Sequence, residues 1–200
     1  MDDGKLFNFG NNGYSMKDIY NLPDGKRAEL IDGQIFYMAP PSFTHQKISR
    51  KLHQAIANYI DSKDGKCEVL AAPFAVFLNP DDDKTYFEPD LSIICDTSKL
   101  DEKGCYGAPD WIIEIVSPSS RPRDYIKKMI KYNMGGVREY WIVDYLQDRI
   151  MAYNFEQETV GECTFADKIK IGIFEDFEID YSTHYLPFTH ILYIWDIVLQ

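Results

Sequence analysis

Two carboxylates stand at positions where a folded chain should disfavour them. Asp90 follows Pro89 at the start of the apolar run 91–95, and Glu114 lies in the middle of the apolar run 111–116. A buried carboxylate is costly unless it is paired or bound to a cation. Two of them on neighbouring strands would repel, and a divalent ion that prefers oxygen ligands, Mg²⁺ or Mn²⁺, would relieve the repulsion. The alternative is that each carboxylate meets an arginine or a helix N-terminus.

A helix predicted over residues 121–134 could bring a cation to the same place. At about 100° per residue, its inner face is expected to consist of Ile126, Met129, Ile130 and Asn133. Lys128 borders that face together with Asp124 and Tyr132, whereas Lys127 is turned toward solvent. A cation beside a carboxylate metal site can stabilise the charge that develops on a phosphate. A solvated basic face is the alternative interpretation for any one of these lysines.

Two further polar residues are weaker candidates. His45 falls in the first turn of a helix predicted over residues 43–62, near the end of its apolar stripe at Ile48 and Leu52. A histidine with a purely structural role is the alternative there. Glu29 alternates with hydrophobic neighbours in a short predicted strand, where an exposed residue is as compatible with the pattern as a site residue.

The elements that must position these residues follow from turn signals and periodicity. Asp32-Gly33 between the runs 27–31 and 34–38 predicts a β-hairpin. Pro40-Pro41-Ser42 ends the second strand and begins the long helix. Further strands are expected at about 67–71, 74–78, 86–95, 111–116, 139–143, 150–155, 159–165 and 168–171, with a loop at 104–109 and a meander formed by the last three strands. The strand–helix–strand order over 111–144 predicts a right-handed crossover. The expected fold class is therefore mixed α/β with a central sheet.

Charge and cysteine content limit the partners and the location. The chain has 21 Lys and Arg residues against 32 Asp and Glu, a net charge of −11, whereas a broad DNA-binding surface is usually basic. DNA could thus be held only through a local basic patch. The four cysteines lack zinc-binding spacing, and Cys95, inside an apolar run, is expected to be a buried, inert thiol. The scattered cysteines agree with a cytoplasmic location. We expect no membrane partner, since no apolar stretch reaches the ~20 residues that span a bilayer.

Many short motifs follow one another in an order that resembles one family. They are Glu29-Leu30-Ile31-Asp32-Gly33, Pro41-Ser42-Phe43-Thr44-His45, Pro89-Asp90, Gly107-Ala108-Pro109-Asp110, Glu114-Ile115-Val116-Ser117-Pro118-Ser119, Arg123-Asp124, Lys128, Tyr132, Gly136-Val137, Glu139-Tyr140-Trp141 and Val143-Asp144. Over about residues 15–180 they resemble the Uma-type family of restriction endonucleases in the PD-(D/E)XK nuclease superfamily. The resemblance implies a restriction-endonuclease-like core, with a central mixed sheet flanked by helices and the metal site at one sheet end.

The resemblance also implies roles for particular residues. The implied site consists of Asp90, Glu114, Lys128, Glu29 and His45, with Mg²⁺ or Mn²⁺ held by Asp90 and Glu114. In the superfamily pattern a lysine stands two residues after the glutamate, but this chain has Val116 there. In the Uma-type branch of the superfamily this lysine lies on the following helix, and Lys128 matches that position. Glu29 and His45 match recurrent family positions of secondary importance.

Two functions are compatible with these residues. The first is a Mg²⁺-dependent endonuclease that acts on DNA. The second is a catalytically inactive or repurposed nuclease fold that binds a nucleic acid or a protein partner. Val116 and the net charge of −11 favour the second, and the complete set Asp90, Glu114 and Lys128 favours the first, which we prefer.

Three segments are expected along the chain. Residues 1–14 form an N-terminal extension, and residues 15–180 form the nuclease-like domain. Residues 181–200 are apolar and aromatic, so this segment is expected to pack on the domain or on a second subunit. A homodimer is the predicted assembly.

Overall fold

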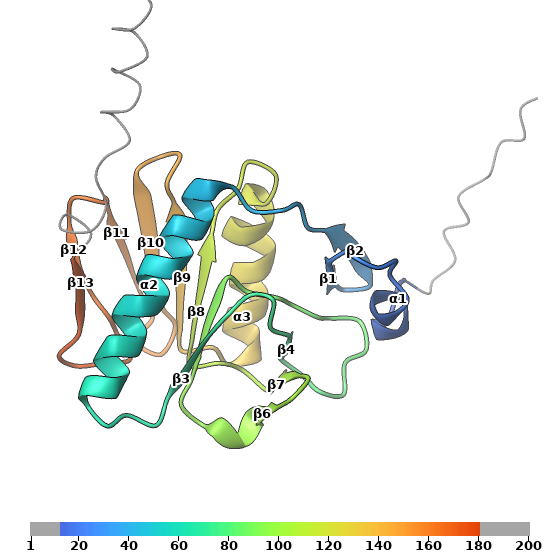
Figure 1. Ribbon diagram of the computed structural model, residues 1–200, viewed down its shortest axis with the longest axis horizontal. Coiled ribbons are helices and arrows are strands. Elements are labelled where there is room, and N and C mark those ends of the chain that lie inside the picture. The colour runs from blue at the N-terminus through green and yellow to red at the C-terminus, as the bar shows by residue number, and fades with distance from the viewer. Residues whose placement is uncertain (1–12, 181–200) are drawn as a thin grey trace, which may run out of the picture.

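A computed structural model describes residues 13–180 of the chain. A central sheet carries helix α2 on one face and helix α3 on the other (Figure 1). The mixed α/β fold class predicted from the sequence is confirmed. The predicted segment 181–200, and all but two residues of the predicted extension 1–14, lie outside the described residues.

Six strands form the central sheet, and their order places the middle of the chain at its centre. From edge to edge the strands are β11 (Thr159–Cys163), β10 (Arg149–Asn154), β9 (Glu139–Asp144), β8 (Trp111–Ile115), β5 (Leu91–Ile94) and β3 (Glu68–Ala71). Strands β8 and β9 are parallel, as the predicted crossover requires, and every other neighbouring pair is antiparallel. Because β5 and β8 are both buried along their whole length, a polar residue at their ends can be shielded from water.

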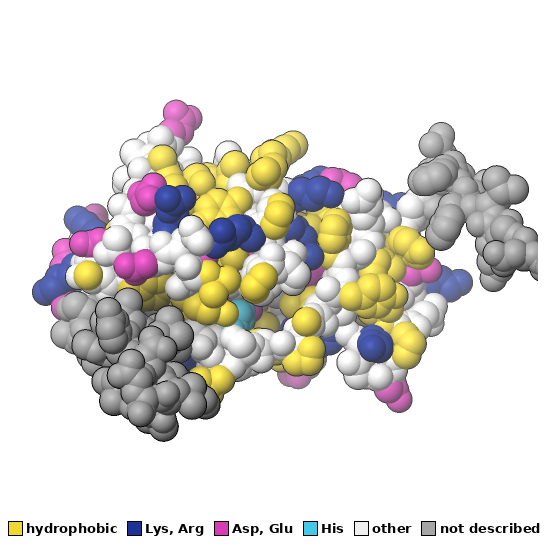
Figure 2. All heavy atoms as spheres, turned by 90° about the horizontal axis from the view of Figure 1, so that it is seen from above, with side chains coloured by type: hydrophobic (Ala, Val, Ile, Leu, Met, Phe, Trp, Pro, Cys, Tyr) yellow, Lys and Arg dark blue, Asp and Glu magenta, His cyan; other side chains and the backbone are white. Residues whose placement is uncertain are grey.

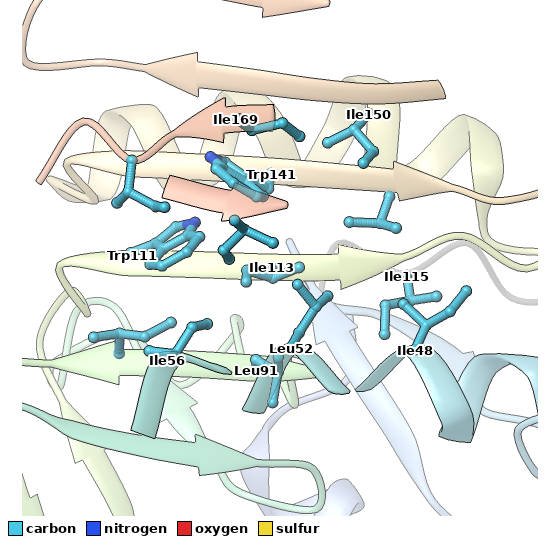
Figure 3. Close-up of a cluster of buried hydrophobic side chains, with 14 of the residues drawn as sticks. Ile48, Leu52, Ile56, Leu91, Trp111, Ile113, Ile115, Trp141, Ile150 and Ile169 are labelled. Atoms are coloured by element: carbon cyan, nitrogen blue, oxygen red, sulfur yellow. The ribbon is translucent and has the colours of Figure 1, made fainter. Parts of the chain in front are cut away.

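Helix α2 (Phe43–Ser62) matches its predicted bounds. It begins at Ser42, whose side chain accepts a hydrogen bond from the His45 N–H at 3.2 Å, which is the usual role of an N-cap serine. Its buried stripe recurs every fourth residue, as the amphipathic pattern predicts, and consists of Ile48, Leu52, Ile56 and Ile60. This stripe packs on the sheet beside Trp111 and Trp141, whose rings are 4.8 Å apart (Figure 3).

The helix on the other face differs from its prediction. It begins as the π-helix η2 (Arg123–Lys128) and continues as α3 (Met129–Gly135). Its predicted inner residues Ile126 and Ile130 are 59% and 45% exposed, and the buried side chains are those of Asp124, Lys128 and Tyr132. The predicted inner face was therefore wrong. The polar face is buried because it meets carboxylates from other elements, as described below.

Several short elements lie outside the central sheet. They are α1 (Met16–Tyr20), the antiparallel hairpin β1 (Ala28–Ile31) and β2 (Gln34–Tyr37), η1 (Thr97–Lys99), and a small sheet in the order β4 (Val76–Phe77), β7 (Gly104–Tyr106) and β6 (Leu100–Asp101). The predicted hairpin is confirmed. The loop predicted at 104–109 was wrong in its first part, because residues 104–106 pair on both sides with β4 and β6.

Strand β12 (Lys168–Lys170) also differs from its prediction. It pairs with β13 (Glu178–Asp180) and not with β11, so the predicted three-stranded meander ends after β11. The hydrophobic residue of β12, Ile169, is buried in the cluster beneath the central sheet. Burial of that side chain, and not continuation of the sheet, fixes the position of the strand.

The cysteines correct a further expectation. Cys95 is not a free thiol, because it forms a disulfide with Cys67. The two residues immediately flank the pairing of β3 with β5, in which Glu68 lies opposite Ile94. Disulfides are rare in cytosolic proteins, so the cysteines no longer support a cytoplasmic location, which stays a prediction. No helix within residues 13–180 is long and apolar enough to cross a membrane.

Candidate active site

A cleft of about 430 Å³ lies where the N-terminal end of α2 meets the end of β8. Four of the five predicted site residues line it: His45, Asp90, Glu114 and Lys128. The fifth, Glu29, contacts Lys128 from behind the cleft wall. Figure 2 looks onto this end of the molecule and shows Lys and Arg side chains among apolar ones across the middle of the view. Residues far apart in sequence thus meet in one hollow.

The register of β5 and β8 brings the two predicted metal ligands together. Leu91 lies opposite Ile113 in this antiparallel pair, so the next position along places Asp90 opposite Glu114. Side chains of directly opposed residues emerge on the same face of a sheet. Burial is the main cause that raises the pKa of Glu114, and the charges of Asp124, Glu29 and Asp90 add to it.

Asp90 is held by partners on both sides of the cleft. Its Oδ2 accepts a hydrogen bond of 2.7 Å from the Ile115 N–H and lies 3.1 Å from His45 Nε2. Burial by itself lowers the pKa of His45, but the hydrogen bond and the charge of Asp90 outweigh it, so the pKa of His45 is raised. The His45–Asp90 contact therefore favours a charged imidazolium beside the carboxylate.

Glu114 is held by the helix on the opposite face. Its Oε1 accepts hydrogen bonds from Lys128 Nζ at 2.8 Å and from the Tyr132 hydroxyl at 2.7 Å. Burial raises the pKa of Glu114, and the nearby Lys128 ammonium opposes this shift. The carboxylate thus has partners in the protein, as the alternative interpretation required, although these are a lysine and a tyrosine and not an arginine or a helix terminus.

Lys128 lies at the centre of a buried cluster of carboxylates. Its Nζ is 2.8 Å from Glu29 Oε1, 2.8 Å from Glu114 Oε1 and 3.7 Å from Asp124 Oδ1. Only 2% of its side chain is exposed. Burial lowers the pKa of Lys128, but the three carboxylates outweigh that effect and raise it. Lys128 is therefore a permanently charged group that is already paired.

The environment of Glu29 excludes the interpretation that it is an exposed strand residue. Its side chain is fully buried, since all four residues of β1 are covered. Oε1 also accepts a hydrogen bond of 3.2 Å from the Glu88 N–H, and Oε2 lies 3.5 Å from Arg123 Nε. The hairpin therefore supplies a carboxylate to the lysine cluster from a part of the chain remote from both strands.

Sequence reasoning did not assign Arg123 or Asp124 to the site. Both line the cleft, and Asp124 is 1% exposed. The i, i+4, i+8 spacing of Asp124, Lys128 and Tyr132 was visible in the sequence, but an apolar stripe lies on the other side of the same helix. The spacing could not show that the polar stripe is the buried one.

The donor set fits a hard divalent cation. The carboxylates of Asp90 and Glu114 face one cleft, and Mg²⁺ is usually held by one or two carboxylates together with several waters. Glu29 Oε2 and Asp124 Oδ1 are buried without a hydrogen-bond partner among the described residues, although Arg123 Nε lies 3.5 Å from the first and Lys128 Nζ 3.7 Å from the second. Within residues 13–180, no group of three or more His, Cys, Asp or Glu side chains forms a ready-made metal site, so the fit rests on two carboxylates.

The sheet, its two flanking helices and the carboxylates at one sheet end define a restriction-endonuclease-like protein. The model of the Uma2 family, described as "putative restriction endonuclease", matches residues 16–180. The chain belongs to this family.

Two individual proteins are similar to the chain. An uncharacterized protein of Synechocystis sp. is 28% identical over 99 residues, which are 50% of each chain. The match thus spans about half the length of that relative. The crystal structure of a putative nuclease of the DUF820 group from Anabaena variabilis superimposes with a TM-score of 0.69 at 18% identity, covering 86% of this chain and 99% of that one. At this identity the likeness establishes the fold.

Proposed function

We propose that this protein is a Mg²⁺-dependent endonuclease that cleaves phosphodiester bonds in DNA. The observation that carries the proposal is the placement of Asp90 opposite Glu114 across β5 and β8, at the wall of a cleft that Lys128 also lines. Membership of a family described as restriction endonucleases supports it. The protein from Anabaena variabilis that shares the fold is described as a putative nuclease.

The proposed roles follow from the contacts in the cleft. Asp90 and Glu114 would hold the divalent ion, which when bound would activate water for attack on phosphorus and neutralise phosphate charge. His45 and the Ile115 N–H orient the carboxylate of Asp90. Such supporting contacts fix the direction of a metal ligand and tune its affinity.

Lys128 has two roles in this proposal. Its charge favours the ionised form of Glu114, because it opposes the effect of burial on the pKa of that group. It also supplies a fixed positive charge in the wall of the cleft, which would stabilise charge that develops on a bound phosphate. The ammonium acts from within a buried cluster, so its position is fixed before substrate binds.

Plasmid cleavage tests the proposal. Wild-type protein with Mg²⁺ should nick or linearise plasmid DNA, and Asp90→Asn should reduce the rate at least a hundredfold. Asp81→Asn is a matched control, because Asp81 is an exposed carboxylate that does not line the cleft. Wild-type protein that leaves plasmid intact with both Mg²⁺ and Mn²⁺ would contradict the proposal.

The alternative is an inactive or repurposed nuclease fold that binds a nucleic acid or a protein partner without cleavage. The observation that favours it is the occupation of Glu114 Oε1 by both Lys128 and Tyr132, since these contacts compete with a metal for the same oxygen. Calorimetry with Mn²⁺ separates the two functions. An endonuclease should bind the ion, whereas DNA binding without Mn²⁺ binding or cleavage would favour the alternative.

A further inference from the structure

The cationic side chains that line the cleft are not equally available to a ligand. Arg27 donates to the carboxylate of Glu88, with its Nε 2.8 Å from Oε2. Lys128 is enclosed by carboxylates. Arg123, by contrast, donates no hydrogen bond to any residue within 13–180, and its closest carboxylate contact is the 3.5 Å approach of Nε to Glu29 Oε2. Among the described arginine and lysine side chains that line this cleft, Arg123 is therefore the one without a hydrogen-bond partner.

Arg123 is nevertheless held in one place. Its guanidinium carbon lies 5.2 Å from the centre of the Phe36 ring on β2, a distance at which the ring face attracts a cation. Its side chain is 16% exposed, so it is partly shielded from water while it still borders the cleft. An arginine fixed in this way loses little side-chain freedom when it binds a ligand.

The chemistry of the group indicates what it would bind. A guanidinium presents planar N–H donors that match the oxygens of a phosphate, often in pairs. Phe36 and the adjacent carboxylate of Glu29 orient it, and Asp90 and Glu114 line the same cleft. A phosphodiester bound near those carboxylates would therefore have Arg123 as an available partner, whereas Lys128 is already paired.

We propose that Arg123 is the substrate-binding residue that contacts a backbone phosphate of DNA, and that Lys128 acts on the reaction only through Glu114 and its fixed charge. This inference rests on the proposed function, because it requires a nucleic acid in the cleft. It adds a phosphate-binding residue that the sequence did not assign.

Binding under conditions without turnover tests the proposal. The full chain would be titrated into a fluorescein-labelled 20-base-pair DNA duplex with Ca²⁺ in place of Mg²⁺, and anisotropy would be recorded over a range of NaCl concentrations. The variants are Arg123→Gln, which removes the charge, and Arg123→Lys, which keeps it without the planar donors. Arg50→Gln is the control, because Arg50 is an exposed residue of α2 that donates to Gln54 Oε1 at 3.4 Å and does not line the cleft.

Arg123→Gln should raise Kd roughly ten- to a hundredfold, the loss expected for a hydrogen bond to a charged group. It should also reduce the slope of log K against log salt by about one. Arg123→Lys should give an intermediate Kd, and Arg50→Gln a change of less than about twofold. A purely structural role for Arg123 would not move the salt slope, and thermal unfolding of each variant shows whether the fold is retained.

Three outcomes that differ from these expectations would overturn the inference. If wild-type protein binds the duplex and Arg123→Gln has the Kd and salt slope of Arg50→Gln, Arg123 does not contact phosphate and the proposed function stands. If Arg123→Gln fails to fold, the folded Arg123→Lys variant decides, and an unchanged Kd refutes the proposal. If wild-type protein does not bind DNA, the proposed function fails and the role of Arg123 fails with it.

Discussion

Lys128 Nζ lies 2.8 Å from Glu114 Oε1, inside the protein and not at the mouth of the cleft. The contact joins the helix after β8 to the strand that carries the carboxylate. Because Glu29 and Asp124 approach the same ammonium, removing the lysine would leave three buried carboxylates with too little positive charge. The same side chain is thus required for the fold as well as for the proposed chemistry.

Loss of the Lys128 ammonium should destabilise the protein strongly. Breaking a buried ion pair by removing one partner costs about 3–5 kcal/mol, so Lys128→Met should lower the free energy of unfolding by about that amount. Lys127→Met, on the exposed side of the same helix, should change it by less than about 0.5 kcal/mol. Urea unfolding followed by circular dichroism measures both. Equal midpoints for the two variants would show that the carboxylates around Lys128 are not ionised.

The carboxylate pair should be the determinant of metal affinity. Glu114→Gln removes a charged oxygen ligand but keeps an acceptor for Tyr132, so Mn²⁺ affinity should fall at least tenfold while the protein stays folded. Glu102→Gln is the control, because Glu102 is exposed and does not line the cleft. Isothermal titration calorimetry gives the affinities. Wild-type affinity in Glu114→Gln would mean that any metal binds elsewhere.

The His45–Asp90 pair should make stability depend on pH. The pKa of His45 is raised above the ordinary value of 6.5, because the hydrogen bond and charge of Asp90 outweigh burial. The contribution of a group with a raised folded-state pKa is fully present below its ordinary pKa and is lost as pH rises through the raised value. The destabilisation caused by Asp90→Asn should therefore be larger at pH 5.5 than at pH 9.

Nuclear magnetic resonance titration of His45 checks the same contact directly. The imidazole resonance in wild-type protein should titrate above its ordinary value, and Asp90→Asn should move the midpoint downward. His53, whose Nε2 is 3.1 Å from the Val69 carbonyl oxygen, serves as the internal reference. A His45 midpoint that does not move in Asp90→Asn would show that the two side chains are not in contact in solution.

The protein should form a homodimer in solution. The apolar and aromatic residues 181–200 are one reason, and the exposed apolar side chains of Ile126, Ile130 and Met134 on one face of the helix are another. Exposed apolar patches of this kind often mark protein contacts. Sedimentation velocity at micromolar concentration measures the assembly. A single monomeric species would contradict the dimer, and Met134→Glu is expected to weaken it if the helix face contributes.

The sequence was sufficient for elements whose causes are local. The hairpin follows from Asp32-Gly33, whose φ angles of 50° and 73° are those of a tight hairpin turn. Helix α2 follows from Ser42 and from an apolar residue at every fourth position. The apolar runs also predicted Asp90 and Glu114 on neighbouring strands. Glu114 lies in β8, and Asp90 immediately precedes its neighbour β5.

Only the tertiary structure decided which side of the second helix is buried and what its side chains meet. Ile126 and Ile130 form a plausible inner stripe by periodicity, yet the opposite stripe is buried because Glu29, a residue 99 positions before Lys128, reaches the same ammonium. An ion cluster of this kind depends on partners from separate elements, and no local pattern contains that information. The pairing of Cys67 with Cys95 and the position of the Arg123 guanidinium beside Glu29 have the same origin, since each is set by which strands and helices become neighbours.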